Sequence, residues 1–117
     1  MIIIYHNPRC GKSRTACSFA NENKVKFEVY EYLKEGLNKV QITDILKKAN
    51  LQALDIIRQT ETVFKENYKG KDLNNAQWIQ AIIDHPILLQ RPIVVGSNYA
   101  MVLRSEEALE LFLTQLQ

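Results

Sequence analysis

Short apolar runs near both ends of the chain flank a long middle segment in which apolar residues recur at helical spacing. Residues 2–6 form a β-branched run typical of a buried strand, residues 12–23 carry apolar side chains at helical spacing, and residues 25–32 alternate between apolar and polar. The first third of the chain therefore predicts a strand, a helix and a second strand.

The middle of the chain, about residues 38–84, predicts helices alone. Asn38 followed three residues later by Gln41 is typical of a capped helix start. The apolar stripe of this helix runs to about Asn50 and comprises Val40, Ile42, Ile45, Leu46 and Ala49.

Further helical pieces follow in the same segment. Residues 51–57 predict a short one and residues 61–68 another. Asn74 or Asn75 then caps a longer helix, which stops before Pro86 because proline cannot continue it.

The last quarter of the chain predicts a hairpin and a helix. Residues 93–95 and 99–103 are strand-like and flank Gly-Ser-Asn at 96–98, a turn composition. Ser105 caps the final helix, whose first turn carries two glutamates that complement the helix dipole.

This order of elements predicts an α/β fold with a small mixed sheet covered by helices. The first two strands are expected to be parallel through a right-handed crossover, and the last two to be an antiparallel pair. At 117 residues the chain has the size of one domain. We therefore expect a single domain over residues 1–117, with a helical insertion at about 38–84.

Composition narrows the classes of function. A net charge of +2 is too small to favour nucleic acid, which usually needs a clustered basic face. No apolar run approaches the ~20 residues that span a bilayer, and the N-terminus lacks the basic leader of a signal peptide. We expect a cytoplasmic protein that binds neither nucleic acid nor membrane.

Cys10 is the strongest candidate for chemistry. It lies between the first predicted strand and the first predicted helix, where unpaired backbone N–H groups stabilise an anion. Basic or imidazole side chains nearby lower a thiol pKa further, and the flanks here supply them at His6, Arg9, Lys12 and Arg14. The pattern favours a reactive thiolate over a buried structural cysteine.

Cys17, the second cysteine, predicts no disulfide with Cys10. Seven residues on a helix separate two Cα atoms by roughly 10 Å, beyond the ~7 Å that a bridge allows. Cys17 lies between Ala16 and Ser18 on a stripe expected to face the core. Its simplest interpretation is a buried filler, and a resolving thiol is the alternative.

Two separated blocks carry a resemblance to a known family. They are residues 5–14, Tyr-His-Asn-Pro-Arg-Cys-Gly-Lys-Ser-Arg, and residues 85–95, His-Pro-Ile-Leu-Leu-Gln-Arg-Pro-Ile-Val-Val. With the order of elements, they resemble the arsenate reductases that work with glutathione and glutaredoxin. The resemblance covers nearly the whole chain and implies a thioredoxin-like fold with a helical insertion.

The resemblance also implies roles for individual residues. Cys10 falls on the catalytic nucleophile of the family, and the substrate-binding arginines fall on Arg58, Arg91 and Arg104. Guanidinium groups suit a tetrahedral oxyanion because they donate paired, charge-assisted hydrogen bonds. Taken singly, each arginine also has an ordinary interpretation as a surface charge.

Three further residues are candidates for supporting the thiolate. His6 supports it by a hydrogen bond or a positive charge, or else only satisfies the end of a strand. Ser13 donates its hydroxyl to the sulfur, caps the helix, or does both. Arg14 helps the thiolate or points into solvent. Pro92 resembles the cis-proline beside the active cysteine of thioredoxin-like folds.

The leading hypothesis is an oxidoreductase enzyme of arsenic detoxification. The Cys10 thiolate attacks arsenate held by the arginines, and glutathione and glutaredoxin complete reduction to arsenite. No cofactor or metal is expected to be bound, and glutathione is a co-substrate. Because residue 13 is Ser, Cys10 lacks a Cys-x-x-Cys partner, which is consistent with an external thiol.

Two alternatives remain open. One is a thioredoxin-like regulator that binds RNA polymerase, although the usual Cys-x-x-Cys switch of that group is absent here. The other is a monothiol oxidoreductase of the same fold that acts on another substrate.

Overall fold

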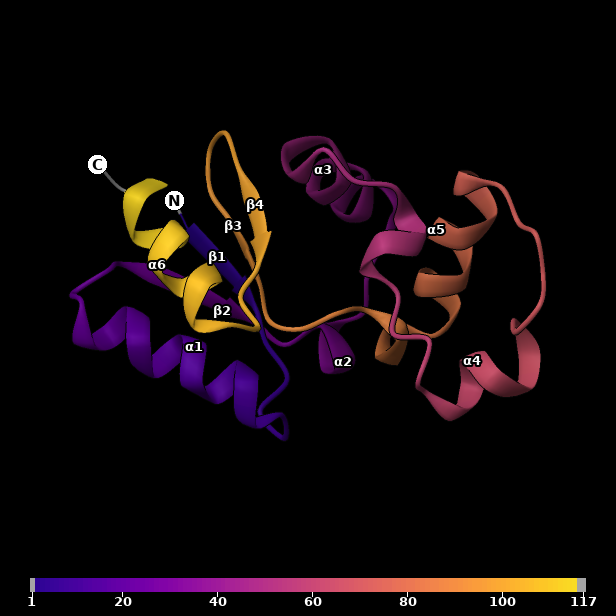
Figure 1. Cartoon of the computed structure of the whole chain (residues 1–117), viewed down its shortest axis with the longest axis horizontal. Helices are drawn as coiled ribbons and strands as arrows, with labels where there is room; N and C mark the ends of the chain where they lie inside the picture. The colour runs from indigo at the N-terminus through magenta and orange to yellow at the C-terminus, as the bar shows by residue number, and fades with distance from the viewer. Residues whose placement is uncertain (1, 116–117) are drawn as a thin grey trace. The chain divides into compact units, whose positions relative to one another are not determined.

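The computed structural model describes residues 2–115, which form two compact units (Figure 1). The first, the sheet unit, contains the residues up to Glu35 together with those from Arg91 onward. The second, the helical unit, is Gly36–Gln90 and includes the helical segment predicted at about 38–84. None of the helices within residues 2–115 is long and apolar enough to cross a membrane.

The sheet unit is built on a four-stranded mixed sheet. Its strands are β1 (Ile2–Tyr5), β2 (Phe27–Tyr30), β3 (Ile93–Val95) and β4 (Ala100–Val102), in the order β2-β1-β3-β4. β1 pairs parallel with β2, and β3 pairs antiparallel with both β1 and β4. The predicted parallel pair and the predicted antiparallel hairpin are both confirmed.

The strand register brings four connections to one end of the sheet. Tyr5 pairs with Tyr30 on one side and with Ile93 on the other, and Ile93 pairs with Val102. These four residues form one row across all four strands. The chain that follows β1, β2 and β4 and the chain that precedes β3 therefore meet at this end, which we call the site edge.

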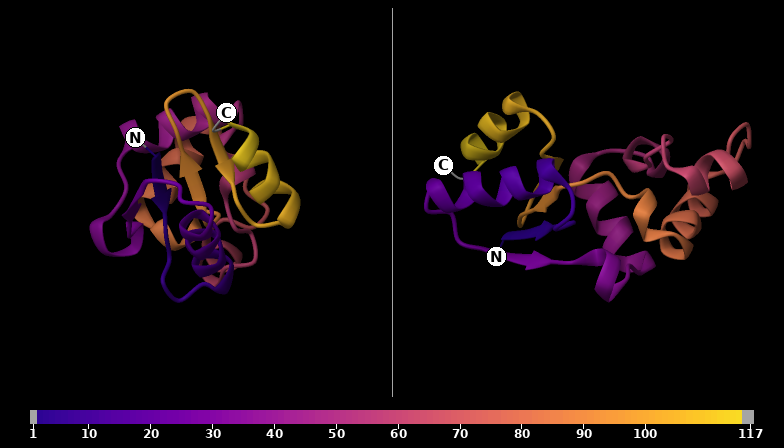
Figure 2. Two further views of the ribbon diagram at one scale, coloured as in Figure 1. Left: turned by 90° about the vertical axis from the view of Figure 1, so that its left-hand side faces the viewer. Right: turned by 90° about the horizontal axis from the view of Figure 1, so that it is seen from below.

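Two helices cover one face of the sheet, α1 (Gly11–Glu22) and α6 (Glu106–Gln115) (Figure 2). The core between them and the strands consists of Ile4, Ala16, Ala20, Val94, Leu103, Leu109 and Phe112. Small alanines on α1 let the helix approach the sheet closely. The predicted cap of α6 is confirmed, since the Ser105 Oγ accepts a 3.0 Å bond from the Ala108 N–H.

The second strand is shorter than its alternating pattern predicts. β2 ends at Tyr30, and residues Tyr32–Glu35 form a short helix, α2. Tyr32 is fully buried, whereas Val29 is 48% exposed. β2 lies at an edge of the sheet, so one side of the strand faces solvent and alternation alone misplaces its end.

The helical unit contains α3 (Lys39–Ala49), η1 (Ala53–Ile56), α4 (Thr62–Asn67), α5 (Asn75–Asp84) and η2 (Pro86–Leu88). Both predicted caps form, and Asn38 and Asn74 each make a reciprocal capping box with the glutamine three residues later. One residue of the predicted stripe is misplaced, because Val40 is 77% exposed. It lies in the first turn of α3, off the face that buries Ile42 and Ile45.

Candidate active site

Cys10 is the N-cap residue of α1, at the end of the connection that leaves β1 at the site edge. Its backbone is extended, with φ −93° and ψ 122°. The Cys10 N–H donates to the Asn7 carbonyl at 3.0 Å, and the Cys10 carbonyl accepts from the Arg14 N–H at 3.1 Å. The thiol is therefore held at the start of the helix, where the next backbone N–H groups are not used by the helix itself.

The surroundings of Cys10 lower the pKa of its thiol. Partial burial alone would raise this pKa, but it is outweighed by the backbone N–H of Ser13, the side-chain hydrogen bond from Arg91, the backbone N–H of Lys12 and the positive charge of Arg91. Each of these stabilises the thiolate, the form that attacks an electrophile. A larger fraction of this sulfur is therefore thiolate at neutral pH than in a free thiol.

Ser13 acts on the sulfur through its main chain, not through the hydroxyl donation predicted for it. Its fully buried hydroxyl lies 2.9 Å from the His6 Nδ1 and accepts a 2.9 Å bond from the Asn7 N–H. Nor does this hydroxyl cap α1, whose N-cap residue Cys10 makes no side-chain cap bond. The physical reason is position: Ser13 lies in the first turn with its side chain turned toward the strand end.

The surroundings of His6 lower the pKa of its imidazole, which favours the neutral ring. Burial lowers its pKa, the carboxylate of Glu31 raises it, and the charge of Arg14 lowers it, with a net lowering. In the neutral ring, Nδ1 can accept a hydrogen bond from the Ser13 hydroxyl group. The structure therefore places His6 in a hydrogen bond with Ser13, and its support of the Cys10 thiolate stays a prediction.

Arg14 is exposed, and its guanidinium group binds the cysteine loop. Nη1 donates to the Pro8 carbonyl at 3.1 Å. Arg14 is not among the groups that shift the pKa of Cys10. Of the two interpretations of Arg14, the structure therefore favours the solvent-facing one, with the added task of fastening the loop that ends at Cys10.

Arg91 and Arg104 belong to the sheet unit, as Cys10 does, and lie in the connections at the site edge. Arg91 precedes β3, its side chain hydrogen-bonds the sulfur, and the Arg91–Pro92 peptide bond is cis, as the resemblance implied. The Pro92 carbonyl accepts a 2.8 Å bond from the Leu103 N–H. This bond ties the chain before β3 to the chain after β4, where the exposed Arg104 follows directly.

Arg58 belongs to the helical unit, between η1 and α4. Its backbone N–H donates to the Leu88 carbonyl at 2.7 Å, and its Nε lies 3.2 Å from a carboxylate oxygen of Glu61. The backbone of this segment is also held by a bridge between Ile57 and Leu89. Arg58 is thus presented from a fixed backbone, and its role toward a substrate stays a prediction.

Comparison with known proteins gives these residues a family context. The model of the ArsC family matches residues 5–112. The chain belongs to the ArsC family.

The ArsC-family chain is 39% identical over 114 residues to an arsenate reductase of Neisseria meningitidis, covering 96% of this chain and 97% of that protein. It is 40% identical over 111 residues to the uncharacterized protein YfgD of Escherichia coli, covering 92% and 93%. An arsenate reductase structure from Vibrio cholerae superposes with a TM-score of 0.86 at 29% identity, covering 93% of this chain and 95% of that one. The predicted thioredoxin-like fold is confirmed.

Cys17, on the same helix as Cys10, has different surroundings in this ArsC-family chain. It is half-buried against the core beneath α1, and its Sγ lies 3.7 Å from the His6 Nδ1. Burial raises the pKa of the Cys17 thiol. Among residues 2–115, both cysteines are free thiols. These surroundings favour the packing role predicted for Cys17.

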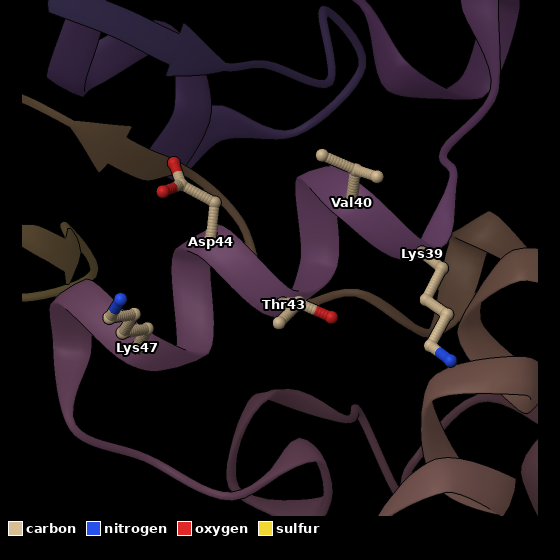
Figure 3. Close-up of a pocket in the computed structure, with 5 residues that line it drawn as sticks. All are labelled: Lys39, Val40, Thr43, Asp44 and Lys47. Carbon is tan, nitrogen blue, oxygen red and sulfur yellow. The ribbon is translucent and has the colours of Figure 1, made fainter.

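Two hollows accompany these residues in the two units. One, of about 410 Å³, lies along α3 and is lined by Lys39, Val40, Thr43, Asp44 and Lys47 (Figure 3). It contains neither a thiol nor an imidazole. The other, of about 340 Å³, lies at the site edge and is lined by Asn7, Pro8, Arg9, Glu31, Leu33 and Lys34. No group of three metal-ligating side chains occurs within residues 2–115.

Glu31 is the residue of this region that sequence reasoning missed. It follows β2 at the site edge, acts electrostatically on His6 and lines the second hollow. The only sequence signal was its place at the end of a predicted strand, parallel to the strand that leads to Cys10. The pairing of Tyr5 with Tyr30 supplies what the sequence lacked, because it aligns the two strand ends.

Proposed function

We propose that this ArsC-family chain is an arsenate reductase that uses Cys10 as its nucleophile. The observation that carries the proposal is the sulfur itself, which is bonded by the Arg91 side chain and by backbone N–H groups at a helix start and has a lowered pKa. The near full-length similarity to an arsenate reductase of Neisseria meningitidis supports the choice of substrate.

In the first step the Cys10 thiolate attacks arsenic. A sulfur–arsenic bond forms, and one arsenic–oxygen bond breaks as the oxygen leaves as water after taking up protons. Arg91 and Arg104 of the sheet unit hold the remaining oxygens, and their charges offset the repulsion between a thiolate and an anionic substrate. A substrate contact of Arg58 stays a prediction that the resemblance implies.

In the second step glutathione reduces the adduct. Its thiolate attacks the Cys10 sulfur, so a disulfide forms, and the electron pair of the sulfur–arsenic bond passes to arsenic. Arsenic is reduced from the +5 to the +3 state, arsenite leaves, and two thiols are oxidised to one mixed disulfide. Glutaredoxin then restores the Cys10 thiol by thiol–disulfide exchange. Residue 13 is Ser, so no Cys-x-x-Cys partner competes with this external thiol.

The test is a coupled assay with arsenate, glutathione, glutaredoxin and NADPH. We expect arsenate-dependent NADPH oxidation by the wild type and a loss of at least ~10³-fold in Cys10→Ser, because the covalent step has no other nucleophile. Cys17→Ser is the matched control and should retain turnover within about twofold, as expected for a packing residue.

Three results would contradict parts of the proposal. Wild-type turnover no faster than that of Cys10→Ser would exclude arsenate reduction by Cys10. Strong loss in Cys17→Ser would exclude the packing role of that residue. If thioredoxin replaced glutathione and glutaredoxin with equal turnover, the proposed electron donors would be wrong while the Cys10 chemistry would stand.

A further inference from the structure

Asn7 is a buried polar residue in the loop that leads from β1 to Cys10. It is 4% exposed, whereas Pro8 and Arg9, which follow it, are exposed. Asparagine is mostly found at protein surfaces, and a buried polar group is normally held by hydrogen bonds. The contacts of Asn7 therefore indicate why this residue is buried.

The polar groups of Asn7 hold the loop at several points. Its N–H donates to the Ser13 Oγ at 2.9 Å, its Oδ1 accepts from the Arg9 N–H at 3.0 Å, and its carbonyl accepts from the Cys10 N–H at 3.0 Å. The bond from the side-chain oxygen to the N–H two residues later forms an Asx turn, and the following Pro8 favours extended backbone at Asn7. Asn7 therefore fixes the path of the chain up to the reactive cysteine.

Asn7 holds both the residue that carries the sulfur and the turn that stabilises the thiolate. The backbone N–H groups of Lys12 and Ser13 lower the pKa of Cys10, and both residues lie in the first turn of α1. A hydrogen bond weakens steeply when its length or angle departs from the ideal, so these donors need a sulfur in the right place. The Asn7 carbonyl holds the Cys10 backbone, and the Asn7 N–H holds the Ser13 side chain.

We propose that Asn7 is a positioning residue that holds the Cys10 sulfur against the first-turn N–H groups of α1. It acts through the loop, because its bonds go to the Arg9 N–H, the Cys10 N–H and the Ser13 hydroxyl group. The alternative is a purely structural role, in which Asn7 only stabilises the fold. The inference rests on the proposed function in one respect, since it takes Cys10 as the nucleophile.

The test measures the pH dependence of Cys10 alkylation by iodoacetamide in the full chain. Asn7→Ala removes the Oδ1 acceptor, whereas Asn7→Ser supplies a hydroxyl oxygen that can form the analogous turn. The two new side chains have similar volumes, so both variants lose similar packing and differ chiefly in the hydrogen bond. Arg91, the charged side chain that acts on the sulfur, is unchanged in both variants.

We expect the alkylation midpoint to rise in Asn7→Ala, because less of the sulfur is then thiolate. The rate below the midpoint should fall roughly three- to tenfold. Asn7→Ser should recover about half of the shift in midpoint, since a hydroxyl group forms this turn more weakly than an amide oxygen does.

Asn23→Ala is the matched control. It removes an exposed asparagine side chain that donates to the Phe19 carbonyl at 2.8 Å, at the other end of α1. Its Cys10 midpoint should equal that of the wild type.

Cys17 in the same molecules separates positioning from loss of the fold. This thiol is half-buried beneath α1, so local unfolding would speed its alkylation, whereas a change confined to the loop would leave its rate unchanged. We expect Cys17 to react at the wild-type rate in all variants, as peptide mapping by mass spectrometry would show.

An unchanged Cys10 midpoint in Asn7→Ala would overturn the proposal, and so would an equal shift in Asn7→Ser or in Asn23→Ala. Faster alkylation of Cys17 in both Asn7 variants would also overturn it, because Asn7 would then support the fold in general. The experiment contains no arsenate, so failure of arsenate reduction and failure of this positioning role are separate results.

Discussion

Cys10 and Cys17 lie two turns apart along α1, and their surroundings move the pKa values of the two thiols in opposite directions. At the helix start, backbone N–H groups and the Arg91 side chain outweigh partial burial and lower the pKa of Cys10. In the middle of the helix, burial acts without such donors and raises the pKa of Cys17.

The difference shows that the reactivity of each cysteine depends on its surroundings in the fold and not on the residue type alone. Backbone N–H groups in the middle of a helix are used by carbonyls one turn earlier, whereas those of the first turn are free to bind an anion. Cys10 also receives a cation from the segment before β3, far away in sequence. Cys17 instead faces the core and the neutral ring of His6.

Alkylation at neutral pH is the most direct test of this difference between the two thiols. Because Cys10 has the lowered pKa and Cys17 the raised one, we expect iodoacetamide to modify Cys10 at least roughly tenfold faster, even though a thiolate of lower pKa is intrinsically less nucleophilic. Peptide mapping by mass spectrometry at timed intervals measures both rates. Comparable rates at the two thiols would show that the helix start does not activate Cys10.

Removing the cation beside Cys10 should bring its behaviour closer to that of Cys17. In Arg91→Gln the pKa of Cys10 should rise, because the guanidinium group no longer stabilises the thiolate. The pH midpoint of Cys10 alkylation should move upward, with a several-fold slower rate below the midpoint. Lys26→Gln is the matched control, since Lys26 is exposed and does not act on the sulfur. An equal shift of the alkylation midpoint in both variants would exclude a specific role of Arg91 in stabilising the Cys10 thiolate.

The network beneath Cys10 should matter for stability. Ser13→Ala leaves the Asn7 N–H without its buried acceptor and removes the partner of the His6 Nδ1. We expect a loss of about 1–3 kcal/mol in the free energy of unfolding, measured by urea denaturation. Ser18→Ala, at an exposed position on the same helix, should change it by less than about 0.5 kcal/mol. Equal stability of both variants would show that the hydroxyl network contributes little.

The smallest effect concerns His6, whose ring lies against the Cys17 sulfur. Glu31 raises the pKa of His6 against the larger effect of burial, so Glu31→Gln should lower this pKa further. The ring should then stay neutral to a lower pH, which an NMR titration of its carbon-bound protons would follow. Glu28→Gln, exposed on β2, should leave the titration unchanged. A rise in the midpoint on loss of Glu31 would contradict the assigned electrostatics.

Most of the helices and strands could be predicted from local sequence signals. The capping boxes at Asn38 and Asn74 mark helix starts correctly because both partners lie within four residues. The end of β2 and the exposure of Val40 were misjudged for the opposite reason. Each depends on which neighbours the element meets, and a periodic pattern does not contain that information.

For the candidate site, too, local sequence features could be predicted and features that depend on tertiary contacts could not. Cys10 could be predicted from sequence because its activation begins with its own helix, and the helix follows directly in the chain. The hydroxyl of Ser13 was assigned to the wrong partner, since the choice between the sulfur, His6 and Asn7 depends on the path of the loop. Glu31 was missed because it lies near this loop only through strand pairing.

The sequence by itself determined a lone thiol at a strand-to-helix turn, with Ser in place of a second cysteine three residues later. These are properties of neighbouring residues and of helix ends. Only the tertiary structure decided that Arg91 touches this sulfur, that the chain before β3 is tied to the chain that leads to Arg104, and that Glu31 and Lys34 line a groove beside the loop. Each of these depends on the register of the sheet, because that register brings together segments up to about ninety residues apart in the chain.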